Sequence, residues 1–127
     1  MLFRSGGTID KVYNQSNGEL TFETTHFPEM LLRARTEVEI SSEILMLIDS
    51  LDMIDAHRKL ILKHCLECDE DRVLITHGTD TMCETAKLLG ESDLNKTIVL
   101  FGAMVPYAVN NSDALFNLGC EIGRAHV

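Results

Sequence analysis

The sequence has no tryptophan, only two prolines, few aromatic residues and few basic ones. Eleven Lys and Arg stand against twenty Asp and Glu, which gives a net charge of −9. Nucleic acids and anionic membranes are bound by clustered Lys and Arg, so we expect neither as a partner. A membrane-spanning helix needs about 20 apolar residues, and no run in this sequence approaches that length.

Cysteine is also scarce, and its spacing is uneven: the four residues are Cys65, Cys68, Cys83 and Cys120. They do not form the framework of a disulfide-rich protein, so we expect a reducing compartment and a cytoplasmic protein. Cys65 and Cys68 form a C-x-x-C pair, but a second pair of metal ligands is missing. Two side chains three apart on a helix explain the pair better than a metal or redox site. We expect no metal ion and no cofactor.

The composition is that of one globular domain, with 45% hydrophobic and 24% charged residues. Strand and helix patterns alternate along it. The predicted strands are Val38–Ile48, Arg72–Thr76 and Thr97–Phe101, and the predicted helices are Ile54–Leu66, Thr79–Leu89 and a last one capped by Ser112 and running to Ile122. This order predicts an α/β fold with an open, mostly parallel sheet between helices, three layers of the Rossmann or flavodoxin type. Ligands of such sheets bind beyond the carboxyl ends of the strands.

The first chemical cluster is Gly6-Gly7-Thr8-Ile9-Asp10. Two glycines allow a tight turn and a close approach of the backbone to a small ligand. They would leave the Thr8 hydroxyl presented and nearby N–H groups free to bind an oxyanion. The alternative for these five residues is an ordinary glycine turn.

The second cluster, His77-Gly78-Thr79-Asp80-Thr81, follows a predicted strand and opens a predicted helix. The Asp80 carboxylate could bind an ammonium group, and the Thr79 hydroxyl could relay a proton or hold a carboxylate. The alternative is that Thr79 or Asp80 only caps the helix. His77 is a structural histidine rather than a base in our interpretation.

Two further loops follow predicted strands. Asp49-Ser50-Leu51-Asp52 precedes the helix expected from Ile54, so Ser50 or Asp52 could simply be its N-cap. Gly102–Pro106 follows the last predicted strand, and it should lie beside the loop of Thr79 at the functional edge of the sheet.

Taken together, the motifs GGTID, DSLDM, HGTDTM and GAMVP occur in an order and spacing that resemble the asparaginase/glutaminase-type amidohydrolase family. The resemblance extends from Gly6 to about Cys120. It implies hydrolysis of the side-chain amide of L-asparagine to L-aspartate and ammonia. Thr8 matches the nucleophilic threonine, which would form an acyl-enzyme that water then resolves.

The resemblance also assigns roles to the other loops. Thr79 and Asp80 match the second catalytic threonine and the aspartate that binds the amino group of the substrate. Ser50 matches a residue that binds its α-carboxylate. The backbone of Ala103 matches the lining of the amide pocket. Leu51 stands where larger members have a polar residue that contacts substrate, which leaves the choice between asparagine and glutamine open.

Two parts of the family site are less directly matched. Tyr13 is the only nearby candidate for a tyrosine on a mobile loop, and a half-buried loop tyrosine is its alternative. The catalytic lysine of the family lies beyond the last matched segment, and in larger members a second domain and a neighbouring subunit complete the site. The resemblance implies homo-oligomers for the full-length protein and negligible activity for these 127 residues alone.

Two other functions stay open. Amidohydrolase domains of this type also serve amidotransferases that act on misacylated tRNA, where a partner protein would bind the RNA. A non-catalytic domain that binds a small amino acid would keep the pocket without turnover.

The two ends resemble translated sequencing adapters, so residues 1–5 and 121–127 are expected to be adapter-derived and residues 6–120 to be the native, partial asparaginase-type domain. Only five residues precede Gly6, and Arg4 is among them. We therefore expect the first strand to be truncated, its neighbours to lose backbone partners, and the chain to be unstable.

Overall fold

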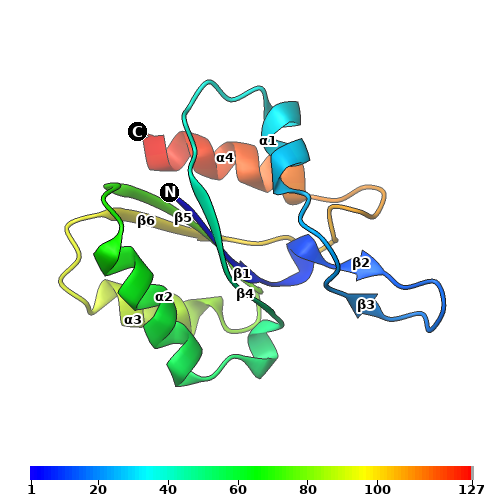
Figure 1. The fold of residues 1–127 in the computed structure, drawn as a ribbon, viewed down its shortest axis with the longest axis horizontal. Coiled ribbons are helices and arrows are strands. Elements are labelled where there is room, and N and C mark those ends of the chain that lie inside the picture. The colour runs from blue at the N-terminus through cyan, green and yellow to red at the C-terminus, as the bar shows by residue number, and fades with distance from the viewer. Residues whose placement is uncertain (127) are drawn as a thin grey trace.

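The computed structural model describes residues 1–126 and has a four-stranded sheet with helices on both faces (Figure 1). The strands are β1 (Leu2–Gly6), β4 (Ser42–Ile48), β5 (Arg72–Thr76) and β6 (Thr97–Phe101). Their order in the sheet is β4-β1-β5-β6, and every neighbouring pair is parallel. The predicted α/β fold with an open parallel sheet between helices is confirmed.

Within residues 1–126, α-helices form the two outer layers, and a short hairpin stands apart from them (Figure 1). Helices α1 (Phe27–Ala34) and α4 (Ala114–His126) cover one face, and α2 (Asp55–Glu67) and α3 (Met82–Gly90) cover the other. The hairpin of β2 (Val12–Tyr13) and β3 (Leu20–Thr21) extends away beyond the end of β1. In the part of the chain that the structure describes, no helix is long and apolar enough to cross a membrane.

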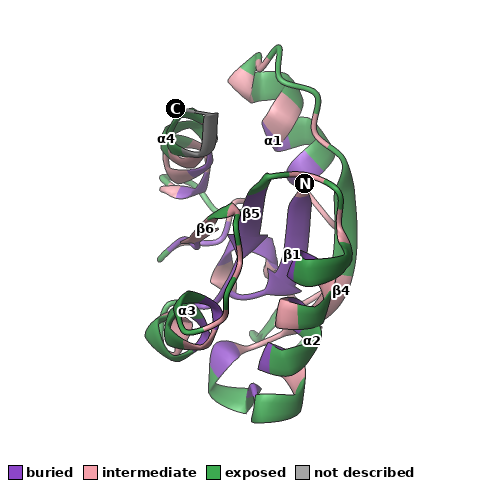
Figure 2. Cartoon of the chain, turned by 90° about the vertical axis from the view of Figure 1, so that its left-hand side faces the viewer, coloured by how far each residue is buried: buried purple, intermediate pink, exposed green. Residues whose placement is uncertain are grey.

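The central strands β1 and β5 are the buried part of the sheet (Figure 2). Their apolar side chains pack on both faces of the sheet. In β1, Leu2 packs with the cluster under α1 and α4, whereas Phe3 packs with the cluster under α2 and α3. The same alternation places Leu74 on one side and Val73 and Ile75 on the other. This is the pattern of a parallel strand buried on both faces, as the continuous apolar run in β5 predicts.

Two predicted elements begin several residues later in the structure, and the last helix, α4, continues past Ile122 to His126. The strand predicted from Val38 begins at Ser42, because its neighbour β1 is five residues long and its pairing starts with Leu2 opposite Ser42. The helix predicted from Thr79 begins at Met82, and the residues before it form a turn. Thr79 and Asp80 therefore lie in a loop, exposed to solvent.

The first strand, β1, is short, but the prediction that its neighbours lose their backbone partners is wrong. Leu2–Gly6 form a fully buried strand in the middle of the sheet, and it pairs with β4 on one side and β5 on the other. Arg4 does not block it, because its guanidinium forms an ion pair with Asp10 inside the protein. The adapter origin of residues 1–5 and 121–127 stays a prediction, although Ile122 packs against the cluster under α4.

Candidate active site

The four loops that follow the parallel strands meet at the carboxyl edge of the sheet. Along the chain, β4 is added to the sheet on one side of β1, and β5 is added on the other side. The direction in which strands are added therefore reverses between β1 and β5. Such a reversal leaves a crevice outside the strand ends. Backbone hydrogen bonds join the loops: the Gly7 N–H donates to the Ile48 carbonyl at 3.0 Å, and the His77 N–H donates to the Phe101 carbonyl at 2.8 Å.

The loops of Thr8 and Thr79 are in direct backbone contact. A Cβ on Gly7 would lie 2.5 Å from the Gly78 nitrogen, so no side chain fits between the two loops. Gly7 also has a φ of +82°, which L-residues with side chains rarely adopt. Thr8 and Thr79 each follow one of these touching glycines, so the two threonine-bearing loops meet at this edge of the sheet.

Thr8 is the first residue of a short 3-10 helix, η1 (Thr8–Asp10), and its side chain is half-buried. The backbone N–H of Lys11 donates to the Thr8 carbonyl at 3.1 Å and closes this turn. Thr79 and Asp80 are exposed, and the N-cap residue of α3 is Thr81. The alternative that Thr79 or Asp80 is the N-cap is therefore wrong, and both side chains face the solvent-accessible edge.

Ser50 is buried behind the loop of Gly78, with 1% of its surface exposed. It lies in the 3-10 helix η2 (Ser50–Asp52), and the N-cap of α2 is Ile54, so the alternative of a Ser50 or Asp52 cap for α2 is wrong. The Thr81 hydroxyl donates to the Ser50 carbonyl at 2.8 Å. Within the described chain, the Ser50 Oγ has no hydrogen-bond partner, which is costly for a buried hydroxyl unless a ligand binds it.

Asp49 and Lys11 connect the loop of Ser50 to the loop of Thr8. The Lys11 Nζ lies 2.5 Å from Asp49 Oδ2, and the other carboxylate oxygen of Asp49 accepts the Leu51 N–H at 3.1 Å. The hydrogen bond from Lys11, followed by that from Leu51, lowers the pKa of Asp49 below its ordinary value. No role was predicted for Lys11, because nothing in a sequence shows which carboxylate a lysine will reach.

His77 is a structural residue, as predicted. Its side chain is completely buried, its Nδ1 lies 2.7 Å from the Gly78 carbonyl, and its Nε2 lies 2.7 Å from the Thr85 Oγ1. Burial lowers the pKa of His77, because desolvation disfavours the imidazolium. With both ring nitrogens engaged, the imidazole braces the turn that presents Thr79.

The fourth loop holds Ala103, which is buried. Side chains at the start of α4 fix the backbone of this loop. Asp113 accepts the backbone N–H groups of Met104 and Val105 at 3.0 to 3.1 Å, and Asn117 donates to the Gly102 carbonyl at 2.9 Å. Burial by itself would raise the pKa of Asp113, but the hydrogen bonds that it accepts outweigh this and hold the pKa below its ordinary value. The spacing of Asp113 and Asn117, four apart around the start of α4, was the available signal for these contacts.

Two sequence candidates lie further from these contacts. Tyr13 is exposed on the hairpin, and its hydroxyl lies over Gly18 at the turn of the same hairpin. Leu51 follows Ser50 but is 71% exposed. The structure therefore places Leu51 at the rim of the site and does not bring Tyr13 to the other residues.

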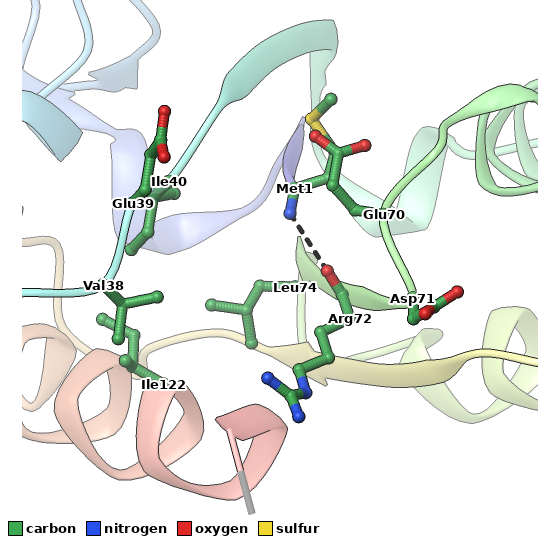
Figure 3. A pocket seen from close by; sticks show the side chains of 9 residues that line it. All are labelled: Met1, Val38, Glu39, Ile40, Glu70, Asp71, Arg72, Leu74 and Ile122. Atoms are coloured by element: carbon green, nitrogen blue, oxygen red, sulfur yellow. Dashed lines mark hydrogen bonds between the residues drawn. The ribbon is translucent and has the colours of Figure 1, made fainter.

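A cavity of about 580 Å³ lies at the opposite edge of the sheet, where the strands begin (Figure 3). Across it the amino group of Met1 donates to the Arg72 carbonyl at 3.0 Å, while Leu74 and Ile122 line its apolar side. Of the site residues predicted from the sequence, none lines this cavity.

The C-x-x-C pair lies at the end of α2, away from the four loops. Cys65 is buried, and desolvation raises the pKa of its thiol to about 11, which makes it a poor nucleophile and ligand at neutral pH. Cys68 accepts a contact from the Lys96 Nζ at 3.4 Å. Among residues 1–126, no three His, Cys, Asp or Glu side chains are grouped as metal ligands would be.

Known proteins are similar to this chain in both sequence and fold. A glutamyl-tRNA(Gln) amidotransferase subunit of Thermococcus kodakarensis is 35% identical over 95% of this chain and 29% of its own length. A probable periplasmic L-asparaginase of Haemophilus influenzae is 37% identical over 80% of this chain and 29% of its own length. The crystal structure of a probable cytoplasmic L-asparaginase from Campylobacter jejuni is 33% identical, with a TM-score of 0.75 over 95% of this chain and 39% of that one.

The chain thus spans less than a third of the curated relatives that it matches here. The family model described as "Asparaginase, N-terminal" matches residues 1–125, nearly the whole sequence. Together with the identity to these relatives, this match shows that the chain belongs to the asparaginase N-terminal family.

Proposed function

We propose that this chain provides the two threonines and the substrate-binding loops of an amidohydrolase site. The complete site converts L-asparagine to L-aspartate and ammonia. The observation that supports it most directly is the contact of Gly7 with Gly78, which brings two threonine-bearing loops together at the carboxyl edge of the sheet. Two hydroxyls and a carboxylate at one edge match what hydrolysis of a small amino-acid amide needs.

In the proposed reaction, the Thr8 Oγ attacks the side-chain amide carbon of the substrate. The C–N bond breaks, ammonia leaves with the proton that the hydroxyl gives up, and an ester joins Thr8 to the aspartyl group. Water then hydrolyses the ester and restores the hydroxyl. Thr79 assists the proton transfers, and the backbone of Ala103 lines the amide pocket.

Asp80 and Ser50 would hold the other end of the substrate. The exposed carboxylate of Asp80 is free to bind the α-ammonium group. The buried Ser50 Oγ lacks a partner within the described chain, and the α-carboxylate of the substrate would supply one. Leu51, at the rim, would contribute to the choice between asparagine and glutamine.

A threonine hydroxyl needs a base to become a good nucleophile. Lys11 is engaged by Asp49, and the family resemblance assigns the catalytic lysine to a position beyond the matched segments. We therefore propose that a lysine from outside these 127 residues completes the site, that the full-length protein is a homo-oligomer, and that this chain alone releases negligible ammonia. Four free cysteines support a reducing compartment such as the cytoplasm, although the relatives named above include a periplasmic one.

A second candidate is the amidase part of an amidotransferase. It is favoured by the 35% identity to the glutamyl-tRNA(Gln) amidotransferase subunit of Thermococcus kodakarensis over 95% of this chain. Such a protein would pass its ammonia to a partner that carries the misacylated tRNA, since this chain is acidic. Ammonia release that rises when partner and misacylated tRNA are added would favour this candidate.

The test is an ammonia-release assay on the full-length protein encoded by the gene that contains this chain, with asparagine and glutamine as substrates. Thr8→Ala and Thr79→Ala should each lower kcat/KM by more than about a thousandfold. The matched control is Thr97→Ala, because Thr97 is exposed at the opposite edge of the sheet. Full activity of Thr8→Ala would contradict the proposal, and binding without turnover in the unaltered protein would favour a non-catalytic amino-acid-binding domain.

A further inference from the structure

Lys11 occupies a junction between three parts of the site edge. Its backbone closes η1, which begins with Thr8. Its Nζ binds Asp49, the residue before Ser50, and also lies 5.6 Å from the ring centre of Phe22 at the base of the hairpin. The side chains of Lys11 and Asp49 are 15% and 31% exposed, so water screens this ion pair only in part.

Asp49, the partner of Lys11, is the N-cap of η2, the turn that contains Ser50. One oxygen of Asp49 accepts the Leu51 N–H, while the other is bound by Lys11, so the carboxylate is held at both ends. On its other side, Ser50 is fixed by the hydrogen bond from the Thr81 hydroxyl. The loop of Ser50 therefore contacts both threonine-bearing loops. Its link to the loop of Thr8 is the ion pair of Lys11 with Asp49.

From these contacts we infer that Lys11 is a positioning residue, which fixes the distance between the Thr8 hydroxyl and the Ser50 hydroxyl through Asp49. The inference rests on the proposed function, in which these two hydroxyls bind opposite ends of one substrate. Thr8 keeps other restraints, namely the Gly7 hydrogen bond to Ile48 and the contact with Gly78. Loss of Lys11 therefore loosens the carboxylate end of the site more than the nucleophile.

The decisive variant is Lys11→Met in the full-length protein, because methionine keeps the apolar stem and removes the charge. We expect KM for asparagine to rise about tenfold while kcat changes by less than about threefold, since a binding contact is weakened. Lys11→Arg, which keeps the ion pair, should restore most of the affinity. The matched control is Lys87→Met, because Lys87 on α3 is exposed and pairs with exposed Glu91, the residue that follows α3.

A double-mutant cycle tests the route through Asp49. Asp49→Asn keeps an acceptor for the Leu51 N–H but loses the charge, so Lys11→Met should have little further effect in that background. Amide hydrogen exchange gives a measurement that needs no turnover: exchange of Leu51 and Asp52 should become faster in Lys11→Met and stay unchanged in Lys87→Met.

The two proposals fail in different ways. If the unaltered protein releases no ammonia from any amide, the proposed function fails, and exchange at Leu51 still decides the role of Lys11. If KM and exchange are both unchanged in Lys11→Met, or if Lys11→Met and Asp49→Asn act additively, the positioning role is wrong.

Discussion

Arg4 and Asp10 form an ion pair inside the protein, with 2.8 Å between Arg4 Nη2 and Asp10 Oδ2. The side chains are 3% and 0% exposed, and the guanidinium also lies 5.2 Å from the ring centre of Phe27. Asp10 ends η1 and Arg4 lies in β1, so this pair anchors the loop of Thr8 to the central strand. Asp10 Oδ1 has no partner within the described residues, so the pair is held through one oxygen.

Removal of one partner of this pair should be more damaging than removal of both. Arg4→Met or Asp10→Leu leaves a single charge without its counter-ion in the core, and we expect a loss of about 3 to 5 kcal/mol in the free energy of unfolding. The double variant replaces the pair with apolar groups and should lose clearly less. Urea denaturation of the three variants gives the comparison, and the idea fails if the double variant loses the sum of the single losses.

Gly7→Ala should damage both folding and the site. The alanine Cβ would collide with the Gly78 backbone, and φ at this position is +82°. We expect the loops to separate and the free energy of unfolding to fall by at least about 1 kcal/mol. Gly90→Ala is the matched control, because Gly90 is the last residue of α3 and a Cβ there meets nothing within 4 Å. Equal unfolding midpoints for the two variants would contradict the importance of this contact.

Local patterns were enough to predict much of the fold and the positions of the loops. Each signal that was used lies within a short stretch of sequence. Examples are the apolar runs of β5 and β6 and the glycines directly before Thr8 and Thr79. β1 could not be found this way, because five residues that include Arg4 form a buried strand only when Asp10 neutralises the charge. The hairpin of β2 and β3 and helix α1 were not predicted.

Contacts between distant residues were the other part that sequence reasoning missed. Lys11 reaches Asp49 across 38 positions, and only the parallel pairing of β1 with β4 brings them together. The starts of β4 and α3 were misplaced for a similar reason. The extent of β4 depends on β1, and the turn before Met82 depends on contacts with the loop of Ser50.

Asp113 should stabilise the fourth loop in a pH-dependent way. Its pKa is lowered in the folded protein from the ordinary 3.8, so the ionised form is favoured by folding. This contribution is fully present well above pH 3.8 and is lost as the pH falls through the lower folded-state pKa. Asp113→Asn should therefore be less stable than the unaltered protein at pH 7, and the difference should shrink below pH 4. Unfolding curves between pH 3 and pH 7 measure it, and a constant difference would refute the assignment.

His77 should also make the protein less stable as the pH falls, here because folding favours the neutral form of the imidazole. Desolvation lowers its pKa from the ordinary 6.5, so below that pH the unfolded chain takes up a proton that the folded protein does not bind. The unaltered protein should therefore lose stability relative to His77→Gln as the pH falls from 8 to 5, by at most about 1.4 kcal/mol per pH unit. An NMR titration of the His77 ring in the folded protein checks the cause directly. A ring that protonates at or above pH 6.5 would mean that the imidazole is not held neutral between the Gly78 carbonyl and Thr85.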